Sequence, residues 1–226
     1  SACLALQLNP LMTQGQIEAL EHHASDELQA LYLPRLVSGE WCGTMNLTEP
    51  QAGSDVGALT TRAVPDGDTF RITGQKIYIT WADNDFTDNV CHLVLARLPG
   101  APPGTKGISL FMVPKILPDG SRNSLRILSL EEKLGLHGSP TAVMEYDGAT
   151  GWMVGAPNKG MAAMFTMMNN ARLGVATQGV GVAEAACQLA ADHARTRVQG
   201  GRPIAEHADV ARMLDRMRAE TFAARA

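Results

Sequence analysis

The stretch "ALTTRAVPDGDTFRITGQKIYIT", residues 58–80, predicts a β-hairpin. Both halves are rich in β-branched and aromatic residues and partly alternate apolar with polar side chains, as strands do. Between the halves stands "PDGD", a combination that favours a tight turn. Further short segments of this kind follow along the chain, namely "VCHLVLARL", "GISLFMVP", "SLRILSL" and "TAVMEYD". Many strands separated by turns predict an antiparallel barrel or sandwich rather than alternating strand and helix units.

Helical patterns stand on both sides of this β region. In residues 1–40, Thr13 is expected to N-cap one helix with Gln16 as its capping-box partner, and Ser25 to start a second helix that Pro34 breaks. Near the other end, more than thirty residues rich in Ala and Met contain no proline, and a second helix follows them. We therefore expect an α+β fold with three regions. These are a helical segment over 1–40, a β domain over 41–157 and an incomplete helical bundle over 158–226.

Composition excludes several classes of function. The 226 residues carry a net charge of −4, so the chain has no general attraction to nucleic acid or to anionic membranes. The four cysteines are widely separated and the six histidines lack ligand spacing, so no metal site is predicted. No apolar run approaches the roughly 18 residues that a membrane helix needs. The first residue is not Met, so the chain is expected to begin inside a longer protein, cytoplasmic if bacterial.

The stretch "MNLTEPQAGSD", residues 45–55, concentrates hydrogen-bonding groups at the end of a predicted strand. Thr48 and Ser54 offer hydroxyl groups, and Gly53 lets the backbone approach a ligand closely. Successive N–H groups in such a turn can also form a concavity that binds anions. The stretch is therefore either a tight turn or a cradle for a polar ligand.

Three further motifs carry polar or aromatic groups. Tyr78 and Thr80 stand two residues apart on a predicted strand, which suits a planar, hydrogen-bonding ring but also an ordinary pair within a sheet. Arg172 of "NNARLGVA" lies in an apolar helix, where it is either paired or positioned for a phosphate or carboxylate. The segment "RTRVQGGRPIAEH" is either a solvated loop or a phosphate contact, and its arginines are Arg195, Arg197 and Arg202.

Together these stretches resemble the acyl-CoA dehydrogenase family. "LTEPQAGSDVGA" resembles the first signature of that family, and "GQKIYIT" its Gly-x-Lys-x-Trp-Ile-Thr strand, with Tyr78 in place of Trp. "NNARLGVA" is similar to the start of its first long C-terminal helix, and "RVQGG" to its Arg-x-x-Phe-Gly segment. The matches occur in the family's order. Asn46, Gly200 and Ala208 depart from it, where a small residue, Phe and Gln are usual. The loops of residues 131–155 are most similar to larger members, including the methylmercaptopropionyl-CoA dehydrogenase type.

The resemblance implies the end of an N-terminal helical domain, a middle β-barrel and the start of a C-terminal helical bundle. It implies FAD as the cofactor. The implied cofactor-binding residues are Met45, Leu47, Thr48, Gly53, Ser54, Tyr78, Ile79, Thr80, Arg197 and His207. The implied substrate-binding residues are Ser54, Asn169 and Arg172.

The activity that the resemblance implies is α,β-dehydrogenation of an acyl-CoA thioester by a homodimer or homotetramer, with electrons passed to an electron-transfer flavoprotein. The family takes its base, a glutamate, either from just before Arg172, where this chain has Ala171, or from far downstream. We therefore expect the base beyond Ala226 and a structural role for Glu49. The alternatives are an acyl-CoA oxidase that uses oxygen, a nucleic-acid-binding relative and a non-catalytic relative.

Overall fold

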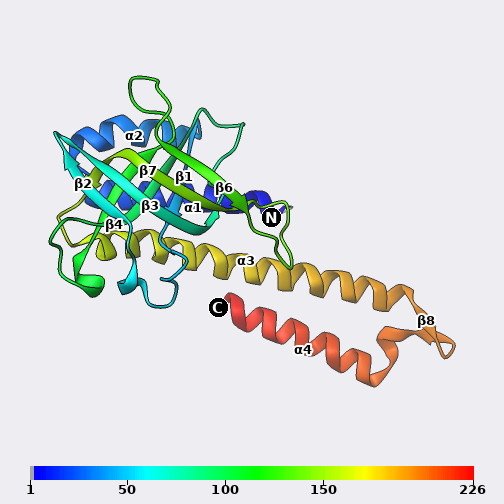
Figure 1. The fold of residues 1–226 in the computed structure, drawn as a ribbon. Coiled ribbons are helices and arrows are strands. Elements are labelled where there is room, and N and C mark those ends of the chain that lie inside the picture. The colour runs from blue at the N-terminus through cyan, green and yellow to red at the C-terminus, as the bar shows by residue number, and fades with distance from the viewer. Residues whose placement is uncertain (1–2) are drawn as a thin grey trace. The chain divides into compact units, whose positions relative to one another are not determined.

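The structure is a computed structural model that describes residues 3–226, and its contacts divide the chain into two compact units. The first unit, Ala2–Ala171, contains a sheet with helices, and the second, Arg172–Ala226, is mostly helical (Figure 1). The helices are α1 (Leu4–His23), α2 (Asp26–Ser38), α3 (Gly160–Thr196) and α4 (Ala208–Arg225), with short 3-10 turns η1 (Val56–Ala58), η2 (Gly104–Gly107) and η3 (Ile204–Glu206). The strands are β1 (Trp41–Asn46), β2 (Arg62–Asp66), β3 (Thr69–Thr80), β4 (Asn89–Arg97), β5 (Ile108–Pro114), β6 (Leu125–Leu130), β7 (Thr141–Val154), β8 (Val198–Gln199) and β9 (Arg202–Pro203).

The sheet of the first unit confirms the predicted hairpin, because β2 and β3 pair antiparallel from Arg62–Thr73 to Asp66–Thr69. The strand order is β1-β4-β2-β3-β7-β5, with β6 on β7 and a further pairing of β4 with β5. These pairings close on themselves, but the link from β2 to β4 is one residue pair, so the barrel is narrowly closed. The expected antiparallel pattern does not extend to β1, which runs parallel to β4.

Two details predicted for the N-terminal helices are wrong. Thr13 does not cap a helix but lies within α1, where its hydroxyl donates to the Asn9 carbonyl and accepts from the Gly43 N–H. Pro34 does not break α2, which continues to Ser38. One missing hydrogen bond is tolerated there because the residues around Pro34, notably Tyr32 and Leu36, are buried against the core.

The start of α2 confirms the prediction made for Ser25. Its side chain accepts a hydrogen bond from the Leu28 N–H at 3.4 Å, which satisfies one of the unpaired donors of the first turn. The helix ends at Gly39, whose left-handed φ of 81° is typical of a C-terminal cap.

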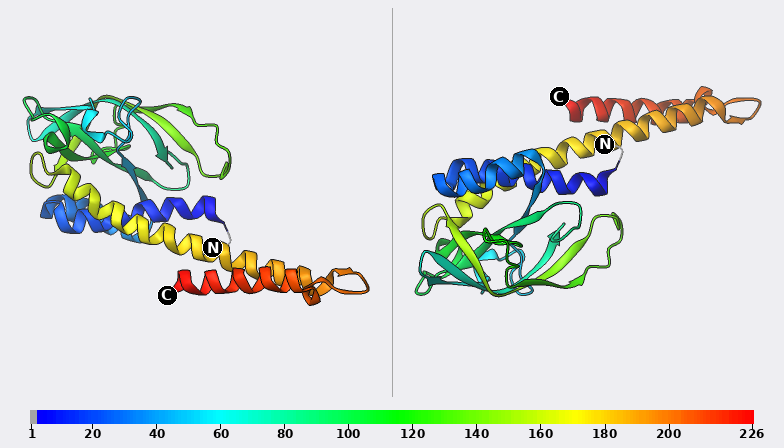
Figure 2. Two further views of the ribbon diagram at one scale, coloured as in Figure 1. Left: turned by 90° about the horizontal axis from the view of Figure 1, so that it is seen from below. Right: turned by 90° about the horizontal axis from the view of Figure 1, so that it is seen from above.

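The core of the first unit has two layers that meet at β4. On one side, α1, α2 and the start of α3 cover the sheet (Figure 2). On the other side, side chains of β3, β4, β5 and β7 fill the inside of the sheet. Leu93 and Leu95 of β4 belong to the first layer, and Val94 and Ala96 to the second. Because β4 is buried on both faces, the interior of its sequence is apolar apart from His92 and does not alternate.

The second unit confirms the predicted helix, loop and helix. The loop contains a short hairpin of β8 and β9, which turns at Gly200 and Gly201 with φ of 62° and 80°. These left-handed angles suit glycine and match the twist of a two-residue hairpin turn. Arg225 of α4 forms an ion pair with Glu184 of α3 at 2.8 Å. Over the described residues, no helix of either unit combines the length and apolarity needed to cross a membrane.

Candidate functional site

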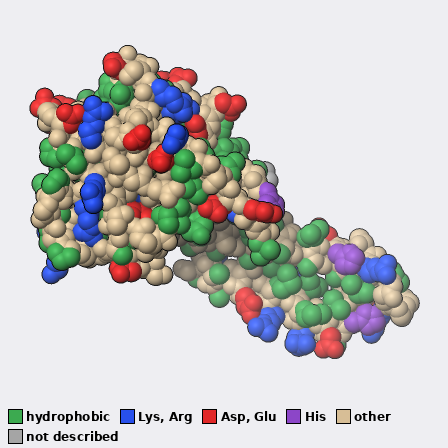
Figure 3. Space-filling view, in the orientation of Figure 1, with side chains coloured by type: hydrophobic (Ala, Val, Ile, Leu, Met, Phe, Trp, Pro, Cys, Tyr) green, Lys and Arg blue, Asp and Glu red, His purple; other side chains and the backbone are tan. Residues whose placement is uncertain are grey.

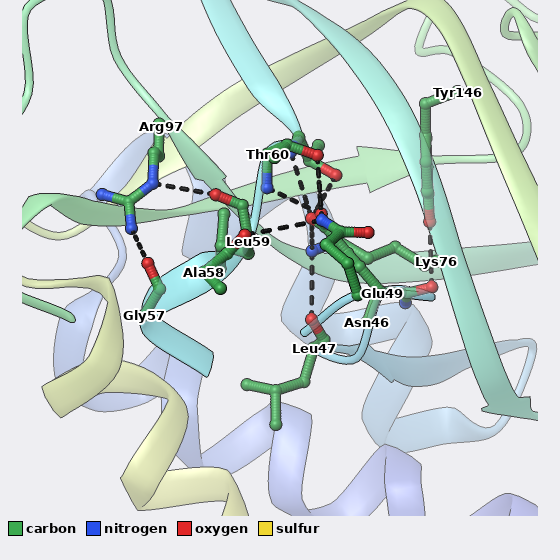
Figure 4. A network of polar contacts seen from close by, with 12 residues as sticks. Asn46, Leu47, Glu49, Gly57, Ala58, Leu59, Thr60, Lys76, Arg97 and Tyr146 are labelled. Carbon is green, nitrogen blue, oxygen red and sulfur yellow. Dashed lines mark hydrogen bonds and ion pairs between the residues drawn. The ribbon is translucent and has the colours of Figure 1, made fainter. Parts of the chain in front are cut away.

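The segment 45–55, called here the signature loop, begins with the last two residues of β1 and is fixed by one buried side chain, that of Glu49. Glu49 and Ala52 exchange two backbone hydrogen bonds of 3.0 Å, which forms a tight turn. The Glu49 carboxylate accepts hydrogen bonds from Lys76 at 2.8 Å, from the Thr61 hydroxyl at 2.6 Å and from the Thr60 N–H at 2.7 Å (Figure 4). These contacts attach the loop to β3 and to the residues that lead into β2.

The pair of Glu49 and Lys76 is charged in spite of its burial. Burial alone would raise the pKa of Glu49, but the Lys76 ammonium and the surrounding hydrogen bonds outweigh it and lower the pKa to about 2. Burial lowers the pKa of Lys76 to about 8, an effect that Glu49 partly offsets. A carboxylate with so low a pKa and with both oxygens occupied is a poor proton acceptor. This geometry supports the structural role expected of Glu49.

The signature loop also contacts β3 through its backbone. The Leu47 carbonyl accepts a hydrogen bond from Lys76 Nζ at 3.1 Å, and the Thr48 carbonyl accepts one from the Ile77 N–H at 2.9 Å. Thr48 is therefore adjacent to the stretch of β3 that carries Tyr78 and Thr80. Three hydroxyl groups of this region form no hydrogen bond with any group of residues 3–226, so these hydroxyls are available to a ligand. They belong to Thr48, Ser54 and Thr80.

Tyr78 lies in a distorted stretch of β3. The register between β3 and β7 shifts between Lys76 and Ile79, which indicates a bulge. Tyr78 has a φ of 61°, a left-handed value that is unusual for a bulky residue. The prediction that Tyr78 and Thr80 share one face of the strand assumed regular alternation of side chains. The bulge interrupts that alternation. Tyr78 is 60% exposed whereas Ile79 is buried, so the strained segment presents an aromatic ring to solvent.

Arg97, which the sequence did not single out, joins two loops beside the signature loop. Its guanidinium donates hydrogen bonds to the carbonyls of Gly57, Leu59, Pro102 and Gly104, and Figure 4 shows the bonds to Gly57 and Leu59. The only sequence feature that could have indicated this role is an arginine at the end of a mostly apolar strand. Its partners are all backbone groups, so no motif of side chains could have revealed this role.

The remaining predicted residues lie on α3 and beyond it. Asn169 belongs to the first unit and Arg172 to the second, and both are exposed. Between them stands Ala171, which has no side chain that could accept a proton. The next residue back, Asn170, donates a hydrogen bond to Glu18 of α1 at 2.8 Å, which fixes this turn of α3 within the first unit.

Arg197 and His207 flank the hairpin of the second unit. Arg197 is exposed and, over the described chain, its side chain forms no ion pair or hydrogen bond. His207 Nε2 donates to the Gln199 carbonyl at 3.0 Å and its Nδ1 accepts from Arg202 at 3.4 Å. These contacts fix the start of α4 to the hairpin and leave Arg197 available to an anion. In neither described unit do three His, Cys, Asp or Glu side chains gather in a way that could hold a metal.

Comparison with known proteins gives consistent matches. The model of the acyl-CoA dehydrogenase middle domain matches residues 44–149. A 3-methylmercaptopropionyl-CoA dehydrogenase of Ruegeria pomeroyi is 50% identical over 241 residues, which cover 100% of this chain and 41% of that protein. A butyryl-CoA dehydrogenase of Syntrophomonas wolfei is 42% identical over 228 residues, which cover 90% of this chain and 37% of that protein. The chain thus spans about two fifths of the length of these curated relatives.

The solved structures agree. Caenorhabditis elegans ACDH-11 in complex with C11-CoA superposes with a TM-score of 0.85 at 29% identity, over 95% of this chain and 37% of that one. The model of the acyl-CoA dehydrogenase C-terminal domain matches residues 158–226, directly after the region matched by the middle domain. The two models together match most of the sequence, and this chain therefore belongs to the acyl-CoA dehydrogenase family.

Proposed function

We propose that this protein catalyses FAD-dependent α,β-dehydrogenation of an acyl-CoA thioester and passes the electrons to an electron-transfer flavoprotein. Both curated relatives named above are acyl-CoA dehydrogenases by name, and the C. elegans structure holds an acyl-CoA. We further propose that its domains are an N-terminal helical segment over residues 1–40, a middle domain over residues 41–157 and a C-terminal domain over residues 158–226.

The observation that carries this proposal is the fit of the signature loop and the β3 bulge to a flavin. An isoalloxazine ring offers a flat apolar face and a rim of carbonyl and nitrogen groups that form hydrogen bonds. The exposed Tyr78 ring matches the face, and the unoccupied hydroxyls of Thr48 and Thr80 match the rim. When bound, FAD supplies the acceptor for the β hydride. The chain itself supplies a rigid wall, since Glu49, Lys76 and Arg97 hold the surrounding loops.

Each residue then has a role in the proposal. Thr48 would hold the pyrimidine side of a bound flavin, Thr80 would offer its hydroxyl near N5, and Tyr78 would pack against the ring. Ser54 faces both the cofactor and the CoA-bearing substrate. The other residues that line the cofactor are Met45, Leu47, Gly53 and Ile79. The residues that contact CoA or order the active site are Asn169 and Arg172. Arg197 would contact the FAD phosphates of a neighbouring subunit in a homodimer or homotetramer. His207 would lie near the cofactor.

The reaction also needs a carboxylate that takes the weakly acidic α proton. Glu49 is unsuitable because burial, hydrogen bonds and Lys76 occupy it, and Ala171 stands where a family glutamate could have served. We therefore propose that a glutamate beyond Ala226 is the base.

Anaerobic titration of the full-length protein with a panel of acyl-CoA thioesters tests this function. Bound flavin is expected to lose its visible absorbance when the preferred thioester is added. A protein that retains FAD but is bleached by no acyl-CoA would contradict the proposal. Oxygen consumption during turnover would instead identify an oxidase, and an active full-length protein without a downstream carboxylate would exclude the proposed base.

A further inference from the structure

A chain of buried polar side chains crosses the inside of the first unit. The Tyr146 hydroxyl donates to Asn46 Oδ1 at 2.9 Å, and Asn46 Nδ2 donates to Thr44 Oγ1 at 2.7 Å (Figure 4 shows the first of these bonds). Thr44 Oγ1 in turn lies 2.6 Å from His92 Nδ1. All four side chains have 0–1% exposure, so water does not compete for their bonds. We call these residues the interior chain.

The bonds of the interior chain have one consistent direction. Thr44 accepts from Asn46, so its own hydrogen is available to His92 Nδ1. Burial lowers the pKa of His92 to about 3, so the ring is neutral, and in the tautomer with its proton on Nε2 the Nδ1 atom accepts that hydrogen. The His92 ring also packs edge-on against the Tyr146 ring, with centroids 6.3 Å apart. The Asn46 amide thus lies between two hydroxyls, with its oxygen toward Tyr146 and its nitrogen toward Thr44.

This chain connects strands that the sheet leaves apart. Thr44 and Asn46 lie on β1, His92 on β4 and Tyr146 on β7. In the sheet, β1 pairs with β4, and β5 separates β4 from β7, so β1 and β7 are not paired with each other. The bond from Tyr146 to Asn46 is thus a cross-link through the interior that attaches the end of β1 to a strand with which β1 does not pair.

Asn46 directly precedes the residues of the signature loop that are already anchored to β3. The carbonyls of Leu47 and Thr48 and the carboxylate of Glu49 all accept hydrogen bonds from Lys76 or Ile77. With Asn46 included, four consecutive residues are held by groups from other strands. Without the Tyr146 bond, only the pairing of β1 with β4 and the bond to Thr44 would hold Asn46 at the side where the loop leaves β1.

We propose that Asn46 and Tyr146 are positioning residues, which fix Met45–Thr48 in the geometry that faces the cofactor. The inference rests on the proposed function, since it names what holds the flavin-facing wall. Asn46 stands where the resembling family usually has a small residue, so this anchor belongs to the chain's own sequence.

The test compares Tyr146→Phe, Asn46→Ala and the double variant in the full-length protein. The first readout is amide hydrogen exchange of a peptide containing residues 45–49 in the FAD-free protein. The second is the affinity for FAD together with the absorption spectrum and reduction potential of the bound flavin. A hydrogen bond of ordinary strength corresponds to a change of about tenfold, so we expect faster exchange and weaker FAD binding by roughly that factor, with shifted flavin bands. The double variant should be no worse than Asn46→Ala, because both changes remove the same bond.

Asn123→Ala is the matched control. Asn123 is also a buried asparagine of the first unit, and its Nδ2 donates to the carbonyls of Pro114 and Thr150 at 2.8 Å, away from the signature loop. It should lower the melting temperature without changing exchange at 45–49 or the flavin spectrum. If Tyr146→Phe and Asn46→Ala behave in the same way as this control, the positioning role is overturned. Wild-type protein that binds no FAD would instead overturn the proposed function itself.

Discussion

Among single residues, the buried pair of Glu49 and Lys76 has the largest effect on the candidate site. Replacing Glu49 by Gln keeps the shape but leaves the Lys76 ammonium buried without a counter-charge, which costs roughly 3–5 kcal/mol. Glu145→Gln is the control, because its partner Arg126 is 70% exposed and such pairs contribute about 1 kcal/mol or less. Urea unfolding of both variants measures the difference. Equal losses would show that burial of the first pair has no particular consequence.

The same pair predicts how stability depends on pH. The pKa of Glu49 falls from 4.5 to about 2 on folding, so its contribution is complete above about pH 4.5 and is lost as the pH falls toward 2. The free energy of unfolding of the wild type should therefore decrease by roughly 3 kcal/mol more than that of Glu49→Gln over this range. Parallel curves for the two proteins between pH 5 and pH 2 would contradict this assignment.

Substitutions of Tyr78 separate the cost of its backbone strain from the contribution of its ring to FAD binding. Its φ of 61° costs any residue with a Cβ roughly 1–2 kcal/mol relative to glycine. Tyr78→Gly should therefore be more stable than Tyr78→Ala by about this amount, although both variants lack the ring. If the ring contacts the flavin, both should bind FAD more weakly than the wild type, measured by titration of the FAD-free protein. Equal stability of the two variants would contradict a left-handed conformation at this position.

At the scale of elements, sequence reasoning worked where the cause is local. The β2–β3 hairpin follows from the turn residues 65–68, and the start of α2 from Ser25. Sequence reasoning failed where a contact with a residue far along the chain determines the local structure. Thr13 is of a residue type that often caps helices, but it lies inside α1, where its hydroxyl accepts a hydrogen bond from the Gly43 N–H. Pro34 is tolerated because tertiary burial supports the helix around it.

The contact between α1 and β1 depends on the absence of a side chain at Gly43. A Cβ at this position would lie 1.6 Å from Gln16 Oε1 and 3.0 Å from Gln16 Cβ, so the buried Gln16 side chain would have to move and its hydrogen bond to the Cys91 carbonyl would be disturbed. We expect Gly43→Ala to destabilise the protein by about 1–3 kcal/mol. Gly135→Ala is the control, since nothing lies within 4 Å of its added Cβ. Thermal unfolding compares the two, and partial rescue by Gln16→Ala would identify the overlap as the cause.

At the scale of the whole molecule, only some residues of the candidate site were predictable. The signature loop, Tyr78 and Thr80 could be named because short motifs carry them in a fixed order. The groups that hold those residues in place could not be named. The Tyr146–Asn46 bond joins residues a hundred positions apart, and Arg97 binds only carbonyls, so neither leaves a pattern in the sequence. Motifs therefore indicate which groups face a ligand, while the supporting contacts follow only from the fold.

The surface of the second unit leads to the last prediction. Figure 3 shows hydrophobic side chains exposed along α3 and α4. The large ones in this unit include Leu173, Val175, Val182, Leu189, Met213 and Phe222. Because stable monomers rarely expose so much apolar surface in one region, we expect the protein to self-associate at micromolar concentrations. Sedimentation velocity should show this association and its loss in Leu189→Ser/Phe222→Ser, whose side chains are 74% and 76% exposed.

The control for that experiment is Leu134→Ser in the first unit, which changes a fully exposed residue between β6 and β7. Single exposed leucines are ordinary on protein surfaces, so this variant should associate as the wild type does. A loss of association in Leu134→Ser equal to that in the double variant would show that general hydrophobicity, rather than the faces of α3 and α4, drives assembly. A wild type that remains monomeric at all concentrations would remove the basis for expecting an oligomer through this surface.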